Sequence, residues 1–367
     1  MRLRKAFPGA DVTELNLAVE THLARRTAAE KLGEWAKEGH FSVSLLQQAS
    51  RSSIAEYRAQ YFKGCDHVLE IGTGTGSDTA ALARAARHVT TIDSDPAASE
   101  LARRNLSLLG ISNVSFLVGE ASETVVGSSS DFDGFFADPM RRRSAGERVR
   151  DGEDYSPPLS RLYNLTSAPL RAIKVSPGLF VEPCPEGWIR QFVGYGEECL
   201  EQTLWFGSSI ADSSVVVTDC GERWTPSSIA DKAGFAETLT GFIVEAHGVV
   251  NRSQHLDLFF RDRGVRLFSP EVAYGVTDTP PSPSKLLTTY RILEDLPYSL
   301  RKLRAALAAR GWSSRTEFKK RAFSGDLEAI RAELDLPAHS HSAPFGTVFL
   351  FRYHGKPWAL LAERVYE

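Results

Sequence analysis

The chain has 367 residues, of which 42% are hydrophobic and 24% charged, and its formal net charge at pH 7 is −3. This composition is typical of a globular protein large enough for two or three domains, and it excludes a disordered or collagen-like chain. It also excludes a polycationic protein, so nucleic acid would have to be bound through a local basic patch.

The targeting and cysteine patterns predict a protein of the reducing cytoplasm. The first residues contain no apolar core of a signal peptide, and no apolar run approaches the roughly 18 residues of a membrane span. Cys65, Cys184, Cys199 and Cys220 are far apart and form no C-x-x-C pair. This spacing argues against structural zinc and against a disulfide scaffold, so we expect no metal and no membrane contact. The oligomeric state is not determined by these features.

Residues 1–62 are predicted to form a helical segment. Apolar residues recur there at helical spacing in three stripes (12–23, 32–36 and 54–62), and the last precedes the first predicted strand. The polar run 47–51 interrupts the stripes. It is a solvated helix face, part of an N-terminal cap over a ligand site, or an arm that contacts substrate.

The segment Val68–Gly76 carries the most informative pattern. An apolar strand ends with Glu70, and alternate glycines follow at Gly72, Gly74 and Gly76 before a helix begins. Glycines permit positive φ and close approach of the backbone to a ligand, and a helix start supplies free N–H groups. The E-x-G-x-G-x-G spacing differs from the G-x-G-x-x-G of dinucleotide binders. It resembles motif I of class I methyltransferases, which bind S-adenosylmethionine (SAM).

That resemblance assigns expected roles to the motif. The three glycines would form the turn around the methionine and ribose part of SAM. Glu70 would orient the amino group of SAM, directly or through water. The alternative is an α/β domain in which the glycine turn is only structural.

Three further strands are each predicted to end at a candidate ligand group. Asp93 closes the second strand, 21 residues after Gly72, which places a carboxylate within reach of ribose hydroxyls. Glu120 follows the third strand, where it would lie near the adenine. Asp138 and Pro139 follow the fourth. Because open α/β sheets bind ligands at the carboxyl ends of their strands, these groups predict one shared site.

Asp138 and Pro139 also indicate the chemistry. Enzymes that use SAM to methylate exocyclic amino groups carry Asp/Asn-Pro-Pro-aromatic at this place. A carboxylate and a backbone carbonyl accept the two N–H bonds of the amine and direct its lone pair toward the methyl group. The aromatic side chain stacks on the extruded base. We therefore predict that Asp138 and the Pro139 carbonyl orient an acceptor nitrogen.

The chain departs from that pattern directly afterwards. Met140 and Arg141 replace the second proline and the aromatic residue. Tyr155 is the candidate for base stacking, and its alternative is an ordinary loop aromatic. Arg141 and Arg142 are expected to contact phosphate, or else form a solvated turn.

Later strands are predicted at 171–175, 188–193 and 214–218, giving a Rossmann-like, seven-stranded methyltransferase sheet within residues 63–280. The apolar stretch from about 240 to 275 is not placed by this pattern. Three prolines within 278–284 predict a linker. Residues 285–367 then read as a small α+β domain that ends in a hairpin.

Charge is uneven in this last part. Between Lys285 and Arg321 there are ten basic and three acidic residues, a local balance of 10 − 3 = +7. A basic patch on a small domain is expected for contact with a phosphate backbone. We predict phosphate contacts from Lys319, Lys320 and Arg321, the alternative being a solvated basic helix face.

Taken as a set, the motifs resemble bacterial class I SAM-dependent methyltransferases with a C-terminal THUMP-like domain. The matching segments lie at 25–31, 48–51, 70–76, 138–142, 155–159, 174–178, 296–300 and 318–321 and in the C-terminal hairpin. The domain name implies kinship with modules that bind structured RNA. The expected function is methylation of a base nitrogen in tRNA or rRNA, with S-adenosylhomocysteine (SAH) as product. Alternatives are a small-molecule or protein methyltransferase, or a non-catalytic protein that binds SAM and RNA.

Overall fold

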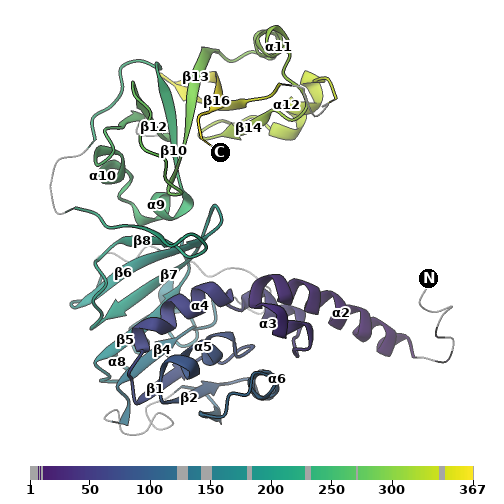
Figure 1. Cartoon of the computed structure of the whole chain (residues 1–367), viewed down its shortest axis with the longest axis vertical. Coiled ribbons are helices and arrows are strands. Elements are labelled where there is room, and N and C mark those ends of the chain that lie inside the picture. The colour runs from purple at the N-terminus through teal and green to yellow at the C-terminus, as the bar shows by residue number, and fades with distance from the viewer. Residues whose placement is uncertain are drawn as a thin grey trace. The chain divides into compact units, whose positions relative to one another are not determined.

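The structure is a computed structural model that describes residues 7, 9, 11–121, 131–141, 151–179, 184–227, 233–269, 272–338 and 344–366. The chain divides into two compact units (Figure 1). The first unit comprises Met1–Tyr195 and Leu200–Asp212, and the second Gly196–Cys199 and Ser213–Glu367. No helix in the described ranges is both long and apolar enough to cross a membrane.

The first unit contains a mostly parallel sheet whose strands follow the order β3-β2-β1-β4-β5-β7-β6. Strands β1 to β5 pair in parallel, and β7 pairs antiparallel with β5. The sequence prediction contained five of these strands and 188–193, but it missed β7. The bounds are β1 His67–Ile71, β2 His88–Asp93, β3 Val114–Val118, β4 Gly134–Ala137, β5 Leu170–Val175, β6 Trp188–Tyr195 and β7 Glu198–Phe206.

Helices cover both faces of this sheet because successive side chains of a strand point to opposite faces. Phe136 of β4 is buried with residues of α4 and α5, and its neighbour Phe135 is buried with residues of α8. The prediction of a Rossmann-like α/β sheet is therefore confirmed. The helices are α4 (Ser52–Ala59), α5 (Ser77–Ala85), α6 (Pro96–Leu108) and α8 (Leu159–Asn164).

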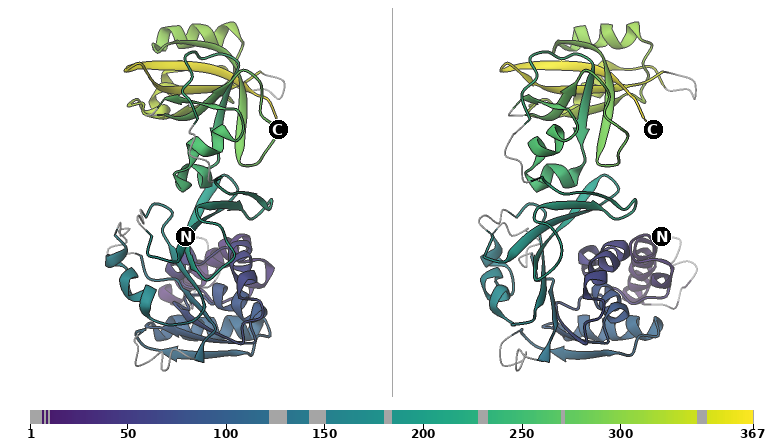
Figure 2. Two further views of the ribbon diagram at one scale, coloured as in Figure 1. Left: turned by 90° about the vertical axis from the view of Figure 1, so that its left-hand side faces the viewer. Right: turned by 60° about the vertical axis from the view of Figure 1, so that its left-hand side comes forward.

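The N-terminal segment forms α2 (Val12–Leu32), α3 (Val43–Gln48) and the short 3-10 turn η1 (Glu34–Lys37), and these helices (purple in Figure 2) lie on one side of the sheet. The prediction of a helical segment is confirmed, but the buried face of α2 differs from the predicted stripe. Leu23 is 53% exposed, whereas Ala24, Ala28 and Leu32 pack into a small core with η1 and α3. The small side chains of Ala24 and Ala28 let the helices approach closely, whereas Val19 and Leu23 remain exposed.

The second unit contains a seven-stranded sheet of order β11-β12-β10-β13-β16-β15-β14. The α+β character predicted for residues 285–367 and the C-terminal hairpin are both present. The bounds are β10 Phe242–Ala246, β11 Arg266–Ser269, β12 Val272–Thr277, β13 Leu287–Pro297, β14 Glu317–Lys320, β15 Thr347–Tyr353, β16 Lys356–Arg364, α9 Gly248–Ser253, α10 Leu256–Arg261, α11 Leu300–Ala309 and α12 Leu327–Leu334. The unit also carries the hairpin of β8 (Ser214–Val217) and β9 (Glu222–Trp224).

The stretch 240–275, which the sequence left unplaced, supplies β10, β11 and β12 to this second sheet. Because β10 pairs with both β12 and β13, the proline-rich residues 278–284 connect two strands of one sheet. They do not separate two compact units, as a linker would. The domain limits expected from the sequence remain a prediction.

The buried position of Phe135 gives a stability prediction. Phe135 is 0% exposed, so Phe135→Ala should lower the free energy of unfolding by about 3–5 kcal/mol in urea denaturation followed by circular dichroism. Val118→Ala is the matched control, because Val118 lies on the edge strand and is 57% exposed. It should change the same quantity by less than about 0.5 kcal/mol. Equal effects at the two positions would contradict the assigned core.

Candidate active site

The loop after β1 is held close to β4 by its backbone. The amide of Asp138 donates to the Ile71 carbonyl at 2.9 Å, and a Cβ at Gly72 would lie 2.5 Å from the Asp138 carbonyl oxygen. The φ angles of Gly72, Gly74 and Gly76 are +90°, +52° and +82°. Gly74 faces open space, whereas a Cβ at Gly76 would collide with α6. Glycine is therefore required at 72 and 76 for packing as well as for φ.

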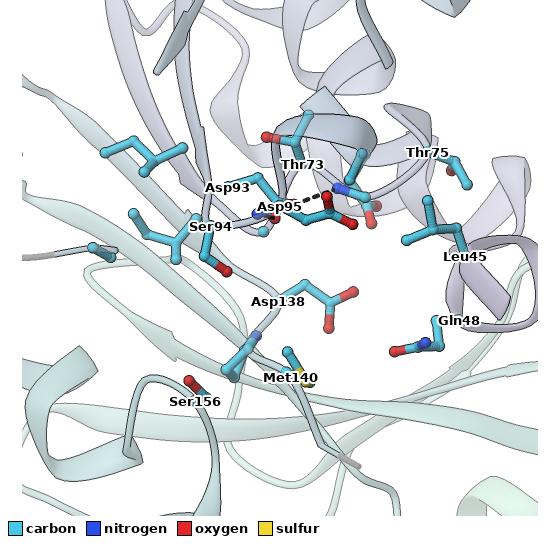
Figure 3. Close-up of a pocket in the computed structure, with 18 of the residues that line it drawn as sticks. Leu45, Gln48, Thr73, Thr75, Asp93, Ser94, Asp95, Asp138, Met140 and Ser156 are labelled. Atoms are coloured by element: carbon cyan, nitrogen blue, oxygen red, sulfur yellow. Dashed lines mark hydrogen bonds between the residues drawn. The ribbon is translucent and has the colours of Figure 1, made fainter. Parts of the chain in front are cut away.

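A cavity of about 650 Å³ lies at this loop, at the carboxyl ends of β1, β2 and β4 (Figure 3). It brings together several predicted site residues that are far apart in the sequence. Those that line it are Gly72, Gly74, Asp93, Glu120, Asp138, Pro139 and Arg141. Arg142 lies outside the described residues, so its predicted phosphate contact stays a prediction.

Asp93, at the end of β2, holds the glycine loop through a hydrogen bond to its backbone. One carboxylate oxygen accepts the amide of Gly74 at 2.9 Å and the other accepts the amide of Asp95 at 2.9 Å (Figure 3). A carboxylate offers about four lone-pair sites, so Asp93 retains acceptor capacity toward the cavity. The same hydrogen bonds hold both the loop and the carboxylate in place.

Glu70 lies behind the loop and not among the cavity-lining residues. It is 0% exposed, one oxygen accepts from the Thr79 hydroxyl at 2.6 Å, and the other has no partner among the described residues. Burial raises the pKa of its carboxyl to about 8. Of the two modes predicted for Glu70, direct contact or contact through water, the structure thus does not bring it to the cavity for the direct one.

The N-terminal segment forms one side of the cavity. Leu45 and Gln48 of α3 line it opposite Asp93 and Asp138 (Figure 3). Asn105 ties this segment to the glycine loop, since its amide nitrogen donates to the carbonyls of both His40 and Thr75 at 3.0 Å. Of the interpretations left open by the sequence, the structure favours the cap over a ligand site.

A buried network of polar and charged side chains connects Asp138 to the N-terminal segment and to α5. Lys174 of β5 donates to a carboxylate oxygen of Asp138 at 2.6 Å and to the hydroxyl of Ser50 at 2.8 Å. The Ser50 hydroxyl donates in turn to Asp78 at 2.7 Å. Arg58 of α4 pairs with both Asp78 and Glu201. These contacts join the N-terminal cap, α5 and the sheet to the carboxylate at the cavity.

Lys174 and Arg58 were missed as site residues by the sequence reasoning. Their signal was present, because each is a cation at a position of the core-facing pattern. Lys174 lies between Ile173 and Val175 of a buried strand, and Arg58 falls at helical spacing between Ile54 and Phe62. Side chains of this kind are almost never fully buried unless they are paired. A search for charged residues at predicted core positions would have found both.

The expected role of Tyr155 is corrected by its burial. Its side chain is 2% exposed and belongs to the core beneath α8, and its hydroxyl oxygen accepts the amide of Ser176 at 3.2 Å. Tyr155 is not among the described residues that line the cavity, so it is not placed to stack on a base there. The described residues that line the cavity include no phenylalanine, tyrosine or tryptophan.

The basic residues predicted to contact phosphate lie in the second unit. Lys319 and Arg321 both pair with Glu245, and all three line a second cavity of about 610 Å³. Lys320 is exposed and donates to the Gly325 carbonyl at 3.0 Å. Since one carboxylate faces two cations, the three basic residues keep only part of the expected positive charge.

Comparisons with known proteins agree with the fold and the cavity. Residues 68–143 match a family model described as a methyltransferase domain, and residues 287–364 match one described as THUMP domain-like. A proposed methyltransferase of Porphyromonas gingivalis W83 has a crystal structure that matches 98% of this chain and 93% of its own, with a TM-score of 0.76 and 19% identity.

Two relatives are similar in sequence, and the name of the first gives the cofactor. An uncharacterised SAM-dependent methyltransferase of Mycobacterium tuberculosis is 29% identical over 337 residues, which are 87% of this chain and 88% of the relative. The protein-L-isoaspartate O-methyltransferase of Dictyoglomus turgidum is 50% identical over only 60 residues, 16% of this chain and 27% of that protein. The chain thus combines a methyltransferase domain with a C-terminal THUMP-like domain and is similar over most of its length to a SAM-dependent methyltransferase, as the sequence resemblance predicted.

The contact between Gly72 and Asp138 gives a binding prediction. Gly72→Ala should weaken SAM binding about 10- to 100-fold in calorimetry, because the new Cβ pushes the loop away from β4 and strain of this kind costs about 1–3 kcal/mol. Gly64→Ala is the matched control, since Gly64 has φ +92° but open space around it. Gly64→Ala should leave the SAM affinity unchanged. Unaltered SAM binding by Gly72→Ala would contradict the placement of SAM at this loop.

The raised pKa of Glu70 predicts how the free energy of unfolding depends on pH. The folded pKa of about 8 lies above that of an unfolded glutamate, so the folded state binds the extra proton between those values. The free energy of unfolding should therefore fall as the pH rises from about 5 to about 8. Glu70→Gln, which imitates the protonated form, should reduce this fall in urea titrations at several pH values. An identical pH profile in both proteins would refute the assignment.

Proposed function

We propose that this methyltransferase transfers the methyl group of SAM to a base nitrogen of structured RNA. The observation that carries the proposal is the shared cavity. The Asp138 carboxylate and Pro139 line the same cavity as Gly72, Gly74 and Asp93. An acceptor held by Asp138 would thus lie beside a cofactor held by the loop.

The described residues fit SAM at one end of this cavity. Gly74 leaves space where a side chain would stand, and Asp93 keeps acceptor capacity for ribose hydroxyls. Glu120 is exposed on the cavity beyond β3, where we place the adenine. Any action of Glu70 on the amino group of SAM would be indirect, because its carboxyl is buried behind the loop.

Bound SAM supplies a methyl group on a positively charged sulfur. The chain has to present a nitrogen lone pair in line with that methyl group, since orientation accounts for most of the catalysis. One oxygen of Asp138 is occupied by Lys174, which fixes the carboxylate plane. The other oxygen and the Pro139 carbonyl are proposed to accept the two N–H bonds of the acceptor amine. As the N–C bond forms and the C–S bond breaks, the nitrogen gives up one proton to this carboxylate or to water.

The RNA part of the proposal is supported by the second unit. Its C-terminal part matches the THUMP domain-like model, and the local charge between Lys285 and Arg321 is +7. Arg301 and Lys302 are exposed on α11, and no ion pair to another described residue involves them. We assign phosphate contacts to these two residues and to Lys320, with a smaller part for Lys319 and Arg321, which share Glu245.

The test is transfer of tritiated methyl groups from SAM to total RNA of cells that lack the gene. Wild-type protein should label an RNA fraction, and Asp138→Ala should lower the rate about 100-fold or more because the amine is no longer oriented. Asp138→Asn keeps an acceptor oxygen and should retain intermediate activity. Calorimetry should show that these variants still bind SAM.

The control is Asp335→Asn, which changes an exposed carboxylate of the second unit and should transfer label at the wild-type rate. Absence of RNA labelling by a wild-type protein that binds SAM would overturn the RNA assignment. Equal rates in wild type and Asp138→Ala would overturn the role of Asp138.

A further inference from the structure

The acceptor end of the cavity poses a problem for an enzyme that holds a nucleobase. A planar base presented in line with a methyl group needs a surface that fixes its ring. The described residues of the cavity supply no aromatic ring, and Tyr155 is enclosed in the core. Under the proposed function, on which this inference rests, another side chain must hold the base.

Arg141 occupies the sequence position of the missing aromatic and lies at the right place. It lines the cavity, its side chain is 23% exposed, and one guanidinium nitrogen lies 3.4 Å from Oδ1 of Asp138. The backbone before it is fixed, because Met140 and Ser156 exchange two N–H···O bonds of 2.9 and 3.1 Å. The guanidinium is therefore held next to the carboxylate that would orient the amine.

We propose that the planar guanidinium of Arg141 is the platform on which the acceptor base stacks, in place of an aromatic ring and not as a phosphate contact. Guanidinium planes stack on nucleobases and aromatic faces, which an ammonium group does not reproduce. Met140 lies beside it, 53% exposed on the cavity, and its polarisable thioether provides further contact with a ring.

The surrounding contacts allow the planar surface of Arg141 and its positive charge to be removed separately by mutation. Lys174 pairs with Oδ2 of Asp138, so replacing Arg141 by an uncharged residue does not leave the carboxylate without a cation. An aromatic residue at 141 would keep a planar surface and remove the charge. Lysine at 141 would keep the charge and remove the plane.

The experiment compares Arg141→Phe with Arg141→Lys in the RNA methylation assay and in filter binding of the same RNA at increasing salt. Stacking on a base is worth about 1–3 kcal/mol, so Arg141→Lys should lower transfer about 5- to 150-fold. Arg141→Phe should keep transfer within about 5-fold of wild type. The slope of log affinity against log salt should be unchanged in Arg141→Phe, since no phosphate contact is lost.

Other outcomes would overturn the proposal that Arg141 stacks on the acceptor base. Activity retained by Arg141→Lys and lost by Arg141→Phe, with a salt slope smaller by about one, would make Arg141 a phosphate contact. Loss in both variants, or in neither, while SAM binding and thermal unfolding match wild type, would also refute it. Absence of RNA labelling by the wild-type protein is a separate result, because it removes the proposed function and this inference with it.

Discussion

The buried chain of charges between Glu201 and Asp138 is the constraint on which the rest of the catalytic unit depends. Arg58 is 2% exposed and faces two carboxylates, so removing Arg58 would take away the buried cation that both Asp78 and Glu201 face. Breaking a buried pair in this way costs about 3–5 kcal/mol. This network of charges includes Ser50 and Lys174. It therefore fixes both the N-terminal cap and the Asp138 carboxylate.

The cavity follows from that constraint and from one close backbone approach. Gly72 touches the Asp138 carbonyl, so the loop that would hold the cofactor and the strand that would hold the acceptor cannot move independently. Asp93 adds a third fixed point through the Gly74 amide. A preorganised arrangement of this kind suits methyl transfer, because the reaction needs alignment of two bound groups more than it needs a strong base.

Much of the fold and of the candidate site could be predicted from the sequence. The features that were not predicted have physical reasons. The strand ends at Glu70, Asp93, Glu120 and Asp138 were predictable because local patterns encode where strands stop. The burial of Tyr155 and the pairing of Lys319 with Glu245 depend on contacts between residues far apart in the chain, which no local pattern records. The proline-rich stretch 278–284 was misread because prolines mark a turn inside a sheet as well as a linker between domains.

We propose that SAM binds between the glycine loop and the N-terminal cap. Hydrogen exchange of the full chain with and without SAH measures this most directly, since it reports protection of backbone amides segment by segment. We predict that SAH slows exchange in two separate segments, 72–78 at the loop and 42–50 at α3. Protection at the loop with no change at 42–50, or binding of SAH that leaves both segments unchanged, would contradict the account.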